Sequence, residues 1–495
     1  MARRPRLSPA REAQKNWLWH TAKTMTLPAS ALSTGDRRME AESYLSSGYG
    51  QRLALDAVLS GGGKLADFAS VWQPSRLKGT VVSPEYGTPF LAATQAYDLR
   101  PIPRKFLSLN KTDDSASRFV ESGTIIVTCS GTVGRATLAT DAIARGLLSH
   151  DLLRVTPTDD SCRGWIYAYL RASTVRQMMS SSQYGHMIKH LEPAHLQNLP
   201  MPRPRTDIGE SLNASVDAIL SARNIATAKM LEAENLFLRS VGDIELVTSR
   251  SAGFSVKTTE IFGRRRRLEA TFHSPDVTDI QKHFTNRGLT LQSIADMGCR
   301  VWLPNRFKRI IAQEGVELVG SSDIFEVNPD LIKRIVDIRP VGGDDGRVKR
   351  GWLLLARSGQ TYGLNGNMVI ANAALENKIV SDHVIRIVAN SECKVRSGYI
   401  YTALSHPLLG RPLLKSLAYG SSIPEIEVAD VAALKVVRLD AEIEDEIADL
   451  AEKGAQMFAD ADIAETKLGA DADMMLKDLI AGDWSKFVPF SARIA

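Results

Sequence analysis

The sequence predicts a mixed α/β protein in which two copies of one globular domain are separated and joined by two long antiparallel helices that form a coiled coil. Three observations predict this architecture. A set of short motifs recurs about 230 residues later, and a long amphipathic stripe follows each copy of the set. In addition, the chain of 495 residues is too long for one ordinary domain.

Six short motifs occur twice in the same order, which is hard to obtain by chance. Val71-Trp72-x-Pro74 returns as Val301-Trp302-x-Pro304, and Tyr184-Gly185 returns as Tyr419-Gly420. The distance between partners drifts only from 228 to 235 residues along the chain. The other four pairs are Arg38-Met39-Glu40-Ala41 with Arg267-Leu268-Glu269-Ala270, Ser130-Gly131 with Ser358-Gly359, Ser149-His150-Asp151 with Ser381-Asp382-His383, and Ile166-Tyr167 with Ile400-Tyr401.

Within each copy, an apolar run that begins at a glycine predicts a buried strand. These runs are residues 123–127 in the first copy and 351–355 in the second. A Ser-Gly turn follows each strand, then a helix near residues 166–179 or 399–409, then the Tyr-Gly loop. We therefore expect the same element order in both copies.

A long amphipathic helix closes each copy. Apolar residues recur at steps of three and four along residues 207–246 and 440–480, with Arg223 in the one gap of the first stripe and a break at Gly454 in the second. A small domain cannot cover the whole apolar face of such a helix, so we expect the two helices to pack on each other. The alternative is that each helix packs on its own domain.

These patterns divide the chain into seven segments, whose limits follow from the ends of the repeats and of the helical stripes. They are an N-terminal extension (1–36), a first globular domain (37–206), a first long helix (207–246), a basic linker (247–266), a second globular domain (267–439), a second long helix (440–480) and a C-terminal tail (481–495).

Charge is segregated along the chain. The net charge is +5, but residues 440–480 hold 13 acidic residues and 3 lysines, so the rest of the chain is strongly basic. A basic body fits a polyanionic partner such as DNA, and a solvated basic surface is the ordinary alternative. The four consecutive arginines of residues 264–267 have the same two interpretations, phosphate contact or solvated loop.

Composition also indicates a compartment. No apolar run is long enough to span a membrane, and the basic N-terminus lacks the apolar core of a signal peptide. The four cysteines form no Cys-x-x-Cys pair, which disfavours a zinc ribbon. We expect a cytoplasmic protein, because isolated thiols fit a reducing compartment.

The order globular domain, long helix, globular domain, long helix resembles the specificity (S) subunits of type I restriction-modification systems. The resemblance covers about residues 37–480. The second copy departs from it, because Leu434-Lys435-Val436-Val437 replaces a proline-rich exit, so a related methylation-linked phage-defence system stays open. The motifs that carry the resemblance are Arg267-Leu268-Glu269-Ala270, the strand and Ser-Gly turn at 123–134, Ser149-His150-Asp151-Leu152-Leu153-Arg154-Val155, Ile166-Tyr167-x-Tyr169-Leu170, Tyr184-Gly185 and Leu199-Pro200-Met201-Pro202-Arg203-Pro204.

The resemblance implies a DNA-binding subunit without catalytic activity. Its globular domains would be target-recognition domains, each reading one half of a bipartite double-stranded DNA site, while the helices would set the half-site spacing. The implied partners are DNA methyltransferase subunits, in two copies, and a restriction or other defence subunit is a further candidate. No cofactor is expected in this chain, and S-adenosylmethionine is expected in the partner methyltransferase.

DNA reading needs polar and cationic side chains on loops that reach a groove. In the first copy the candidates are Arg76, Lys78, Ser130, Thr132, Arg135, Tyr184, His186 and Lys189. In the second copy they are Arg306, Lys308, Arg357, Gln360, Tyr362, Asn365, Tyr419 and Ser421. For each of them an ordinary surface residue is the alternative, and both Tyr-Gly loops have a structural turn as a further alternative.

The second long helix offers a candidate surface for a basic protein partner. Its candidate residues are Glu444, Asp445 and Asp449. The alternative is that their charge only keeps an exposed helix soluble.

Catalytic motifs are mostly missing. No Asn/Asp-Pro-Pro-aromatic motif of an adenine methyltransferase occurs, and residues 58–65 lack the first glycine and the final Ser/Thr of a phosphate-binding loop. Glu376-x-Lys378 matches half of a metal-dependent nuclease signature, with Asp344 and Asp345 upstream. We therefore predict a non-catalytic subunit. The alternatives are a bipartite DNA-binding regulator or targeting factor without a methyltransferase partner, and an autonomous nuclease.

Overall fold

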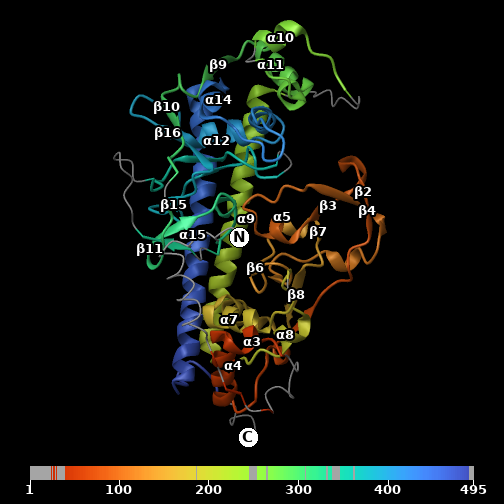
Figure 1. The fold of residues 1–495 in the computed structure, drawn as a ribbon, viewed down its shortest axis with the longest axis vertical. Helices are drawn as coiled ribbons and strands as arrows, with labels where there is room; N and C mark the ends of the chain where they lie inside the picture. Colours follow the sequence, from red (N-terminus) through yellow and green to blue (C-terminus); the bar gives the residue numbers. More distant parts are fainter. Residues whose placement is uncertain are drawn as a thin grey trace, which may run out of the picture.

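Two α/β domains lie along a pair of long helices in a computed structural model of the protein (Figure 1). The structure describes residues 39–185, 187–242, 253–263, 266–306, 308–330, 333–336, 346–360 and 363–489, with single positions before residue 39 and at residue 244. The predicted N-terminal extension lies almost entirely outside these ranges, as do residues 247–252, 264 and 265 of the basic linker. No helix within them is both long and apolar enough to cross a membrane.

The first copy is built on an antiparallel sheet with the strand order β1-β8-β5-β6. The strand predicted at residues 123–127 is its inner strand β5 (Ile125–Thr128), and every residue of it is buried. Its β-branched residues suit a strand that is covered on both faces. The other strands are β1 (Ala69–Trp72), β6 (Ala136–Leu138) and β8 (Leu152–Pro157).

The second copy repeats this sheet with the order β10-β16-β13-β14. The register is repeated as well, because Val71 faces Val155 in the first copy and Val301 faces Ile387 in the second. The predicted duplication of one α/β domain is therefore confirmed. The strands are β10 (Cys299–Trp302), β13 (Leu353–Ala356), β14 (Met368–Ile370) and β16 (Val384–Ala389).

Each copy has two helices where the sequence predicts one. In the first copy, α6 (Arg163–Arg171) and α7 (Ser173–Ser182) are separated by Ala172, whose backbone is extended. In the second copy, α12 (Ser397–Ser405) and α13 (Gly410–Ser416) are separated by an interruption that begins at His406. The apolar period continues across each break, so the pattern alone does not reveal it.

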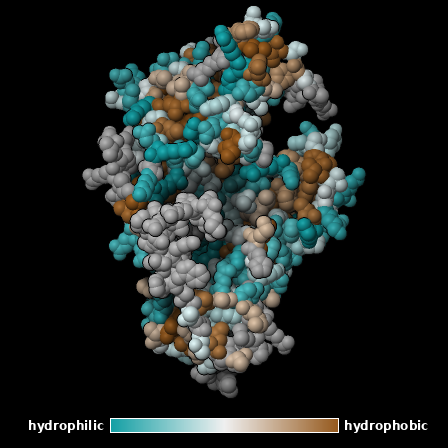
Figure 2. Space-filling view, in the orientation of Figure 1, coloured by the Kyte–Doolittle hydropathy of each residue, from teal (hydrophilic) through white to brown (hydrophobic). Residues whose placement is uncertain are grey.

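A second sheet in each copy contains one parallel strand pair. Leu91 faces Leu148 in the first copy, and Val319 faces Val380 in the second. The first of these sheets reaches away from the long helices, and Figure 2 shows apolar side chains over it. The strands are β2 (Gly79–Val82), β3 (Thr88–Leu91), β4 (Lys105–Thr112) and β7 (Leu147–Leu148), and then β11 (Ile311–Val319), β12 (Arg334–Ile335) and β15 (Ile379–Val380).

The exits of the two copies differ as their sequences do. In the second copy β17 (Lys435–Arg438) forms a ladder with β9 (Thr290–Ser293). In the first copy only the bridge between Lys64 and Pro200 remains, since proline has no N–H to donate. The proline-rich exit thus changes the ladder but keeps the path of the chain. The shorter helices are α3 (Ala41–Leu45), α4 (Ser47–Val58), α5 (Asp141–Ala144), α8 (Pro193–Gln197), α10 (Thr258–Gly263), α11 (Pro275–Asn286) and α14 (Val428–Ala433).

The long helices α9 (Thr206–Val241) and α15 (Ala441–Ile480) run side by side and antiparallel (Figure 1). Gly454, which breaks the apolar stripe, lies where the helices approach each other closely: a Cβ there would lie 3.0 Å from the Ala226 carbonyl oxygen. The predicted pairing of the two helices is confirmed. Each long helix also packs on its own domain, which is the alternative that the sequence leaves open. The Gly164 N–H of α6 donates to the Asn213 side chain on α9, and the Gly398 N–H of α12 donates to Glu452 on α15.

The first long helix ends five residues before its predicted end at residue 246. Gly242 follows with a φ of +80°, a backbone conformation that suits glycine. A side chain at this position would collide with the Arg287 guanidinium, whose Nη1 lies 1.9 Å from the place of a Cβ. The second copy therefore begins to pack at the point where α9 stops.

Candidate nucleic-acid interface

In the first copy the Ser-Gly turn after β5 lies against the Tyr-Gly loop after α7. Ser130 and Tyr184 both form single β-bridges to His190, and the Gly131 N–H donates to the Lys189 carbonyl at 3.0 Å. Gly131 has a φ of +74°, so this tight turn favours glycine. The fold therefore brings together four residues predicted to contact DNA: Ser130, Thr132, Tyr184 and Lys189.

The second copy repeats this arrangement. Ser358 and Tyr419 both form single bridges to Glu425. The Gln360 side chain donates through Nε2 to the Ser422 carbonyl at 2.6 Å. The fold again gathers four predicted residues: Arg357, Gln360, Tyr419 and Ser421.

The chemistry at the meeting point of turn and loop differs between the copies. In the first copy the Ser130 hydroxyl lies 3.2 Å from His190 Nδ1. In the second copy Glu425 accepts from the Ser358 hydroxyl at 3.0 Å and pairs with Arg357 Nη2 at 2.7 Å. The same backbone frame thus presents different donors and acceptors in the two copies.

Two further segments lie beside the Ser-Gly turn and the Tyr-Gly loop of each copy. They are the Trp-Pro loop after β1 or β10, and the turn Ser149-His150-Asp151 or Ser381-Asp382-His383. We call these four segments together the loop cluster of the copy. Gln73 Nε2 donates to the His150 carbonyl at 2.6 Å, and Arg306 Nε lies 3.7 Å from Asp382 Oδ2. The side chain of Arg306 is 84% exposed. The cations of the Trp-Pro loops are all exposed at the edge of the clusters: Arg76, Lys78, Arg306 and Lys308.

Both loop tyrosines are held by carboxylates. The Tyr184 hydroxyl donates to Glu192 Oε1 at 2.7 Å, and this hydrogen bond raises the pKa of Tyr184 to about 12. The Tyr419 hydroxyl donates to Glu427 Oε1 at 2.8 Å, which raises the pKa of Tyr419 in the same way. Both phenols stay protonated at neutral pH, and both hydrogen bonds position their loops.

Two buried arginines, Arg154 and Arg386, donate hydrogen bonds to backbone carbonyls of the loop clusters. Neither is among the predicted site residues. Arg154 Nη1 donates to the Ser149 carbonyl at 3.0 Å, and Arg386 Nη1 donates to the Ser381 carbonyl at 3.0 Å. Their guanidinium carbons lie 5.5 Å and 5.6 Å from the ring centres of Trp72 and Trp302. Burial lowers the pKa of Arg154 to about 10. A signal was present: an arginine recurs inside a buried strand of both copies.

Three residues predicted to contact DNA or a partner are buried, which corrects their assignment to the surface. Arg135 is only 8% exposed, and its Nη1 pairs with Glu326 at 2.5 Å. Asn365 is fully buried and donates to the Pro424 carbonyl at 3.0 Å. Glu444 is 6% exposed and accepts from Arg438 Nε at 2.8 Å. Two further candidates, His186 and Tyr362, lie outside the described residues.

The other acidic candidates of the second long helix remain on the surface. Asp449 pairs with Arg396 Nη1 at 2.6 Å and keeps 70% of its side chain exposed. Asp445 lies 3.9 Å from the same guanidinium group. These two residues therefore stay accessible to a partner.

Glu376 and Lys378, which match half of a nuclease signature, both form ion pairs with other residues. Arg350 Nε lies 2.7 Å from Glu376 Oε2, and Lys378 Nζ lies 2.9 Å from Glu317 Oε2. Asp344 and Asp345 lie outside the described residues. Within the described ranges, no group of three or more His, Cys, Asp or Glu side chains is placed to hold a metal ion.

Comparison with known proteins gives similarity to solved structures alone. No protein-family model matches the chain, and no curated protein matches it. An S subunit of the type I restriction-modification system from M. genitalium is 12% identical, with 84% of this chain and 94% of that chain covered and a TM-score of 0.29. The HsdS subunit from Thermoanaerobacter tengcongensis is 12% identical, with 85% and 96% covered and a TM-score of 0.26.

A third structure comes from work on complex assembly and conformational transition of the type I R-M system. It is 11% identical, covers 83% of this chain and 98% of that chain, and has a TM-score of 0.26.

Proposed function

We propose that this chain is a DNA-specificity subunit that reads a bipartite site and targets methyltransferase subunits to it in a restriction-modification or related phage-defence system. One observation carries the proposal. The same loop cluster is built twice, once on each copy, at two places along one antiparallel helix pair (Figure 1). A protein that reads two separated half-sites needs this arrangement.

The chemistry of the clusters suits DNA. Exposed arginines and lysines of the Trp-Pro loops supply phosphate contacts, which fix position without reading sequence. Hydroxyl, amide and guanidinium groups of the Ser-Gly turns and Tyr-Gly loops supply donors and acceptors for base edges. His190 in one cluster corresponds to Glu425 in the other, and we propose from this difference that the two half-sites differ in sequence.

In this proposal the chain contributes recognition and positioning, and the methyl transfer takes place on partners that bind S-adenosylmethionine. Two methyltransferase copies, one near each recognition domain, match the duplication of the chain. The exposed carboxylates of Asp445 and Asp449 offer a docking charge for a basic partner surface. We place the complex in the cytoplasm, where host DNA lies.

Footprinting of the complex on DNA tests the proposal. We expect two protected tracts separated by a fixed gap, and we expect Arg306→Ala with Lys308→Ala to weaken binding to all sequences by removing phosphate contacts. The matched control is Arg350→Ala, an exposed arginine of the same copy that pairs with Glu376 outside the loop cluster. A single continuous footprint, or equal loss of binding in the control, contradicts the proposal.

A further inference from the structure

The two copies touch each other directly, apart from their shared helices. Asp98 of the first copy forms a single antiparallel bridge to Glu326 of the second. The Leu99 N–H donates to the Phe325 carbonyl at 2.8 Å, and the Val327 N–H donates to the Tyr97 carbonyl at 2.7 Å. The paired segments, residues 97–99 and 325–327, are equivalent in the repeat at a distance of 228 residues. The approximate twofold axis that relates the copies therefore passes through this contact.

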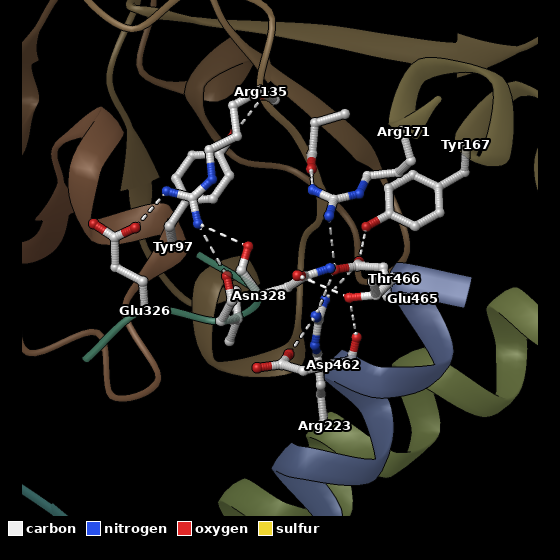
Figure 3. A network of polar contacts seen from close by, with 12 residues as sticks. Tyr97, Arg135, Tyr167, Arg171, Arg223, Glu326, Asn328, Asp462, Glu465 and Thr466 are labelled. Atoms are coloured by element: carbon white, nitrogen blue, oxygen red, sulfur yellow. Dashed lines mark hydrogen bonds and ion pairs between the residues drawn. The ribbon is translucent and has the colours of Figure 1, made fainter. Parts of the chain in front are cut away.

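Arg135 reaches across the same junction. Its guanidinium pairs with Glu326 Oε2 at 2.5 Å and donates to the Val327 carbonyl at 3.0 Å. On its own side, the guanidinium carbon stacks 4.0 Å from the ring centre of Tyr97 (Figure 3). A buried guanidinium tolerates little displacement of these partners, because each lost contact leaves a charged group unsolvated.

Asn328, which follows Val327 in the second copy, contacts the helix pair. Asn328 Nδ2 donates to Glu465 Oε2 on α15 at 2.6 Å. Glu465 also accepts from Arg223 of α9 at 2.9 Å and from the Tyr167 hydroxyl of the first copy (Figure 3). One buried network thus joins the first copy, both long helices and the second copy.

A second ion pair between the copies lies at the edge of this contact. Arg176 Nη2 of α7 lies 3.1 Å from Asp330 Oδ2, with 25% and 30% of the two side chains exposed. We call these contacts together the clasp: residues 97–99, Arg135 and Arg176 of the first copy with residues 325–330 of the second.

We infer that the clasp fixes the orientation of one loop cluster relative to the other, and that it thereby restricts the DNA site to one gap length between the half-sites. The inference rests on the proposed function. It assigns gap selectivity to Arg135, Arg176, Glu326 and Asp330, in addition to the helix pair that holds both copies.

The shift of a half-site that one added base pair causes is large compared with what the contacts of the clasp can follow. Adding one base pair to the gap moves a half-site by about 3.4 Å along the DNA and turns it by about 35°. A recognition domain that followed this turn would break hydrogen bonds of 2.5–3.1 Å across the clasp. Long helices bend gently at small cost, so the helix pair alone gives the weaker restraint.

Selection from DNA libraries tests the inference on the full chain with its partner. The probe is a pool of duplexes with two randomised tracts separated by gaps of several lengths. From the wild-type protein we expect two half-site motifs at one gap, and about tenfold or greater loss of affinity when that gap changes by one base pair. For Glu326→Ala with Asp330→Ala we expect the same motifs at two or more gaps, with less than about threefold loss.

Asp217→Ala is the matched control. Asp217 of α9 pairs with Arg163 of the first copy, so this variant breaks a contact between a copy and its own helix without touching the clasp. It should keep the single gap. Asp330→Arg should relax the gap by opposing two cations, and Arg176→Asp added to it should restore the single gap.

The outcomes separate the two levels of the account. If the wild-type protein selects no bipartite motif, the proposed function fails, and the inference fails with it. If the wild-type protein selects one gap and the clasp variant selects the same gap with the same penalty, only the inference is overturned. If the clasp variant binds DNA more tightly than the wild-type protein but selects the same gap, the inference is also overturned. The clasp would then weaken DNA binding without restricting the gap length.

Discussion

The two long helices have equivalent positions beside the two copies, and these positions hold charged side chains beside the first copy and uncharged side chains beside the second. On the side of the first copy, Arg223 is fully buried and pairs with Asp462 at 3.0 Å and Glu465 at 2.9 Å. A shift of 235 residues, the offset between the long helices, places Phe458, Thr227 and Met230 at the equivalent positions beside the second copy. These three residues line a cavity of about 100 Å³.

This difference shows that helix pairing does not require one kind of contact. The buried charges beside the first copy each need their partner. At the equivalent positions beside the second copy, uncharged side chains line a cavity instead. We therefore expect the first side to fail on single substitutions and the second side to accept them.

The largest effect is expected when the charged side loses its cation. Arg223→Met leaves Asp462 and Glu465 buried without their main partner, so the free energy of unfolding should fall by about 3–5 kcal/mol. Phe458→Leu at the equivalent position is the control and should cost less than about 1.5 kcal/mol. Denaturant titration measures both values, and similar costs at the two positions would contradict the comparison.

The charged side should also depend on pH. Burial alone would raise the pKa of Glu465, but the charges of Arg223 and Arg171 outweigh it and lower the pKa to about 2. A lowered pKa gives stability that is full above the ordinary value of 4.5 and is lost as the pH falls toward 2. The neighbouring Asp462 has its pKa raised, chiefly by burial, and so contributes with the opposite sign.

Comparison with Glu465→Gln isolates the contribution of this one carboxylate. The stability advantage of the wild-type protein over the variant should be constant from neutral pH to about pH 4.5 and should shrink below it. Thermal unfolding at a series of pH values checks this. An advantage that grows on acidification would mean that Glu465 is protonated in the folded protein.

A smaller effect is expected from filling the cavity of the apolar side. Ala455 lines this cavity, so Ala455→Val should raise the free energy of unfolding by about 0.5–2 kcal/mol. Ala226→Val is the control, because Ala226 lies against Gly454 where the helices meet closely. It should destabilise by about 1–3 kcal/mol through overpacking. If both variants lose stability, the apolar side is as tightly specified as the charged side.

The smallest effect on stability is expected on the helix surface. Asp449→Lys removes an exposed ion pair with Arg396, and the free energy of unfolding should change by less than about 1 kcal/mol. Co-purification of the methyltransferase should nevertheless weaken. Asp217→Lys on α9 is the control with a similar exposed pair. Equal retention of the partner by both variants would remove Asp449 from the docking surface.

The shared frame of the two copies could be predicted because its signals are local. The motif pairs predict strands and loops that occur in the same order in both copies, from β1 and β10 to α6 and α12. The apolar stripes marked both long helices, since a period of three to four residues depends on neighbours alone. Even the polar Arg223 was visible as a gap in the stripe.

The contacts between the copies could not be predicted in this way. Arg135 and Glu326 lie 191 residues apart, and neither carries a pattern that indicates the other. The sequence places Arg135 among the DNA-binding candidates, because an arginine beside a Ser-Gly turn has the same local sequence whether it faces solvent or the second copy. The prediction that Asn365 contacts DNA is wrong for a similar reason. Its buried amide donates to the Pro424 carbonyl and stabilises the turn, which motif spacing does not reveal.

Mapping of modified bases in the genome of a host that carries this chain tests the central claim most directly. The host should carry a chain in which residues 37–206 are replaced by the matching region of a relative. Two independent readers on one frame predict that one half of the modified motif changes, while the other half and the gap stay the same. Change in both halves, or a modification pattern that is the same with and without this gene, would contradict the account.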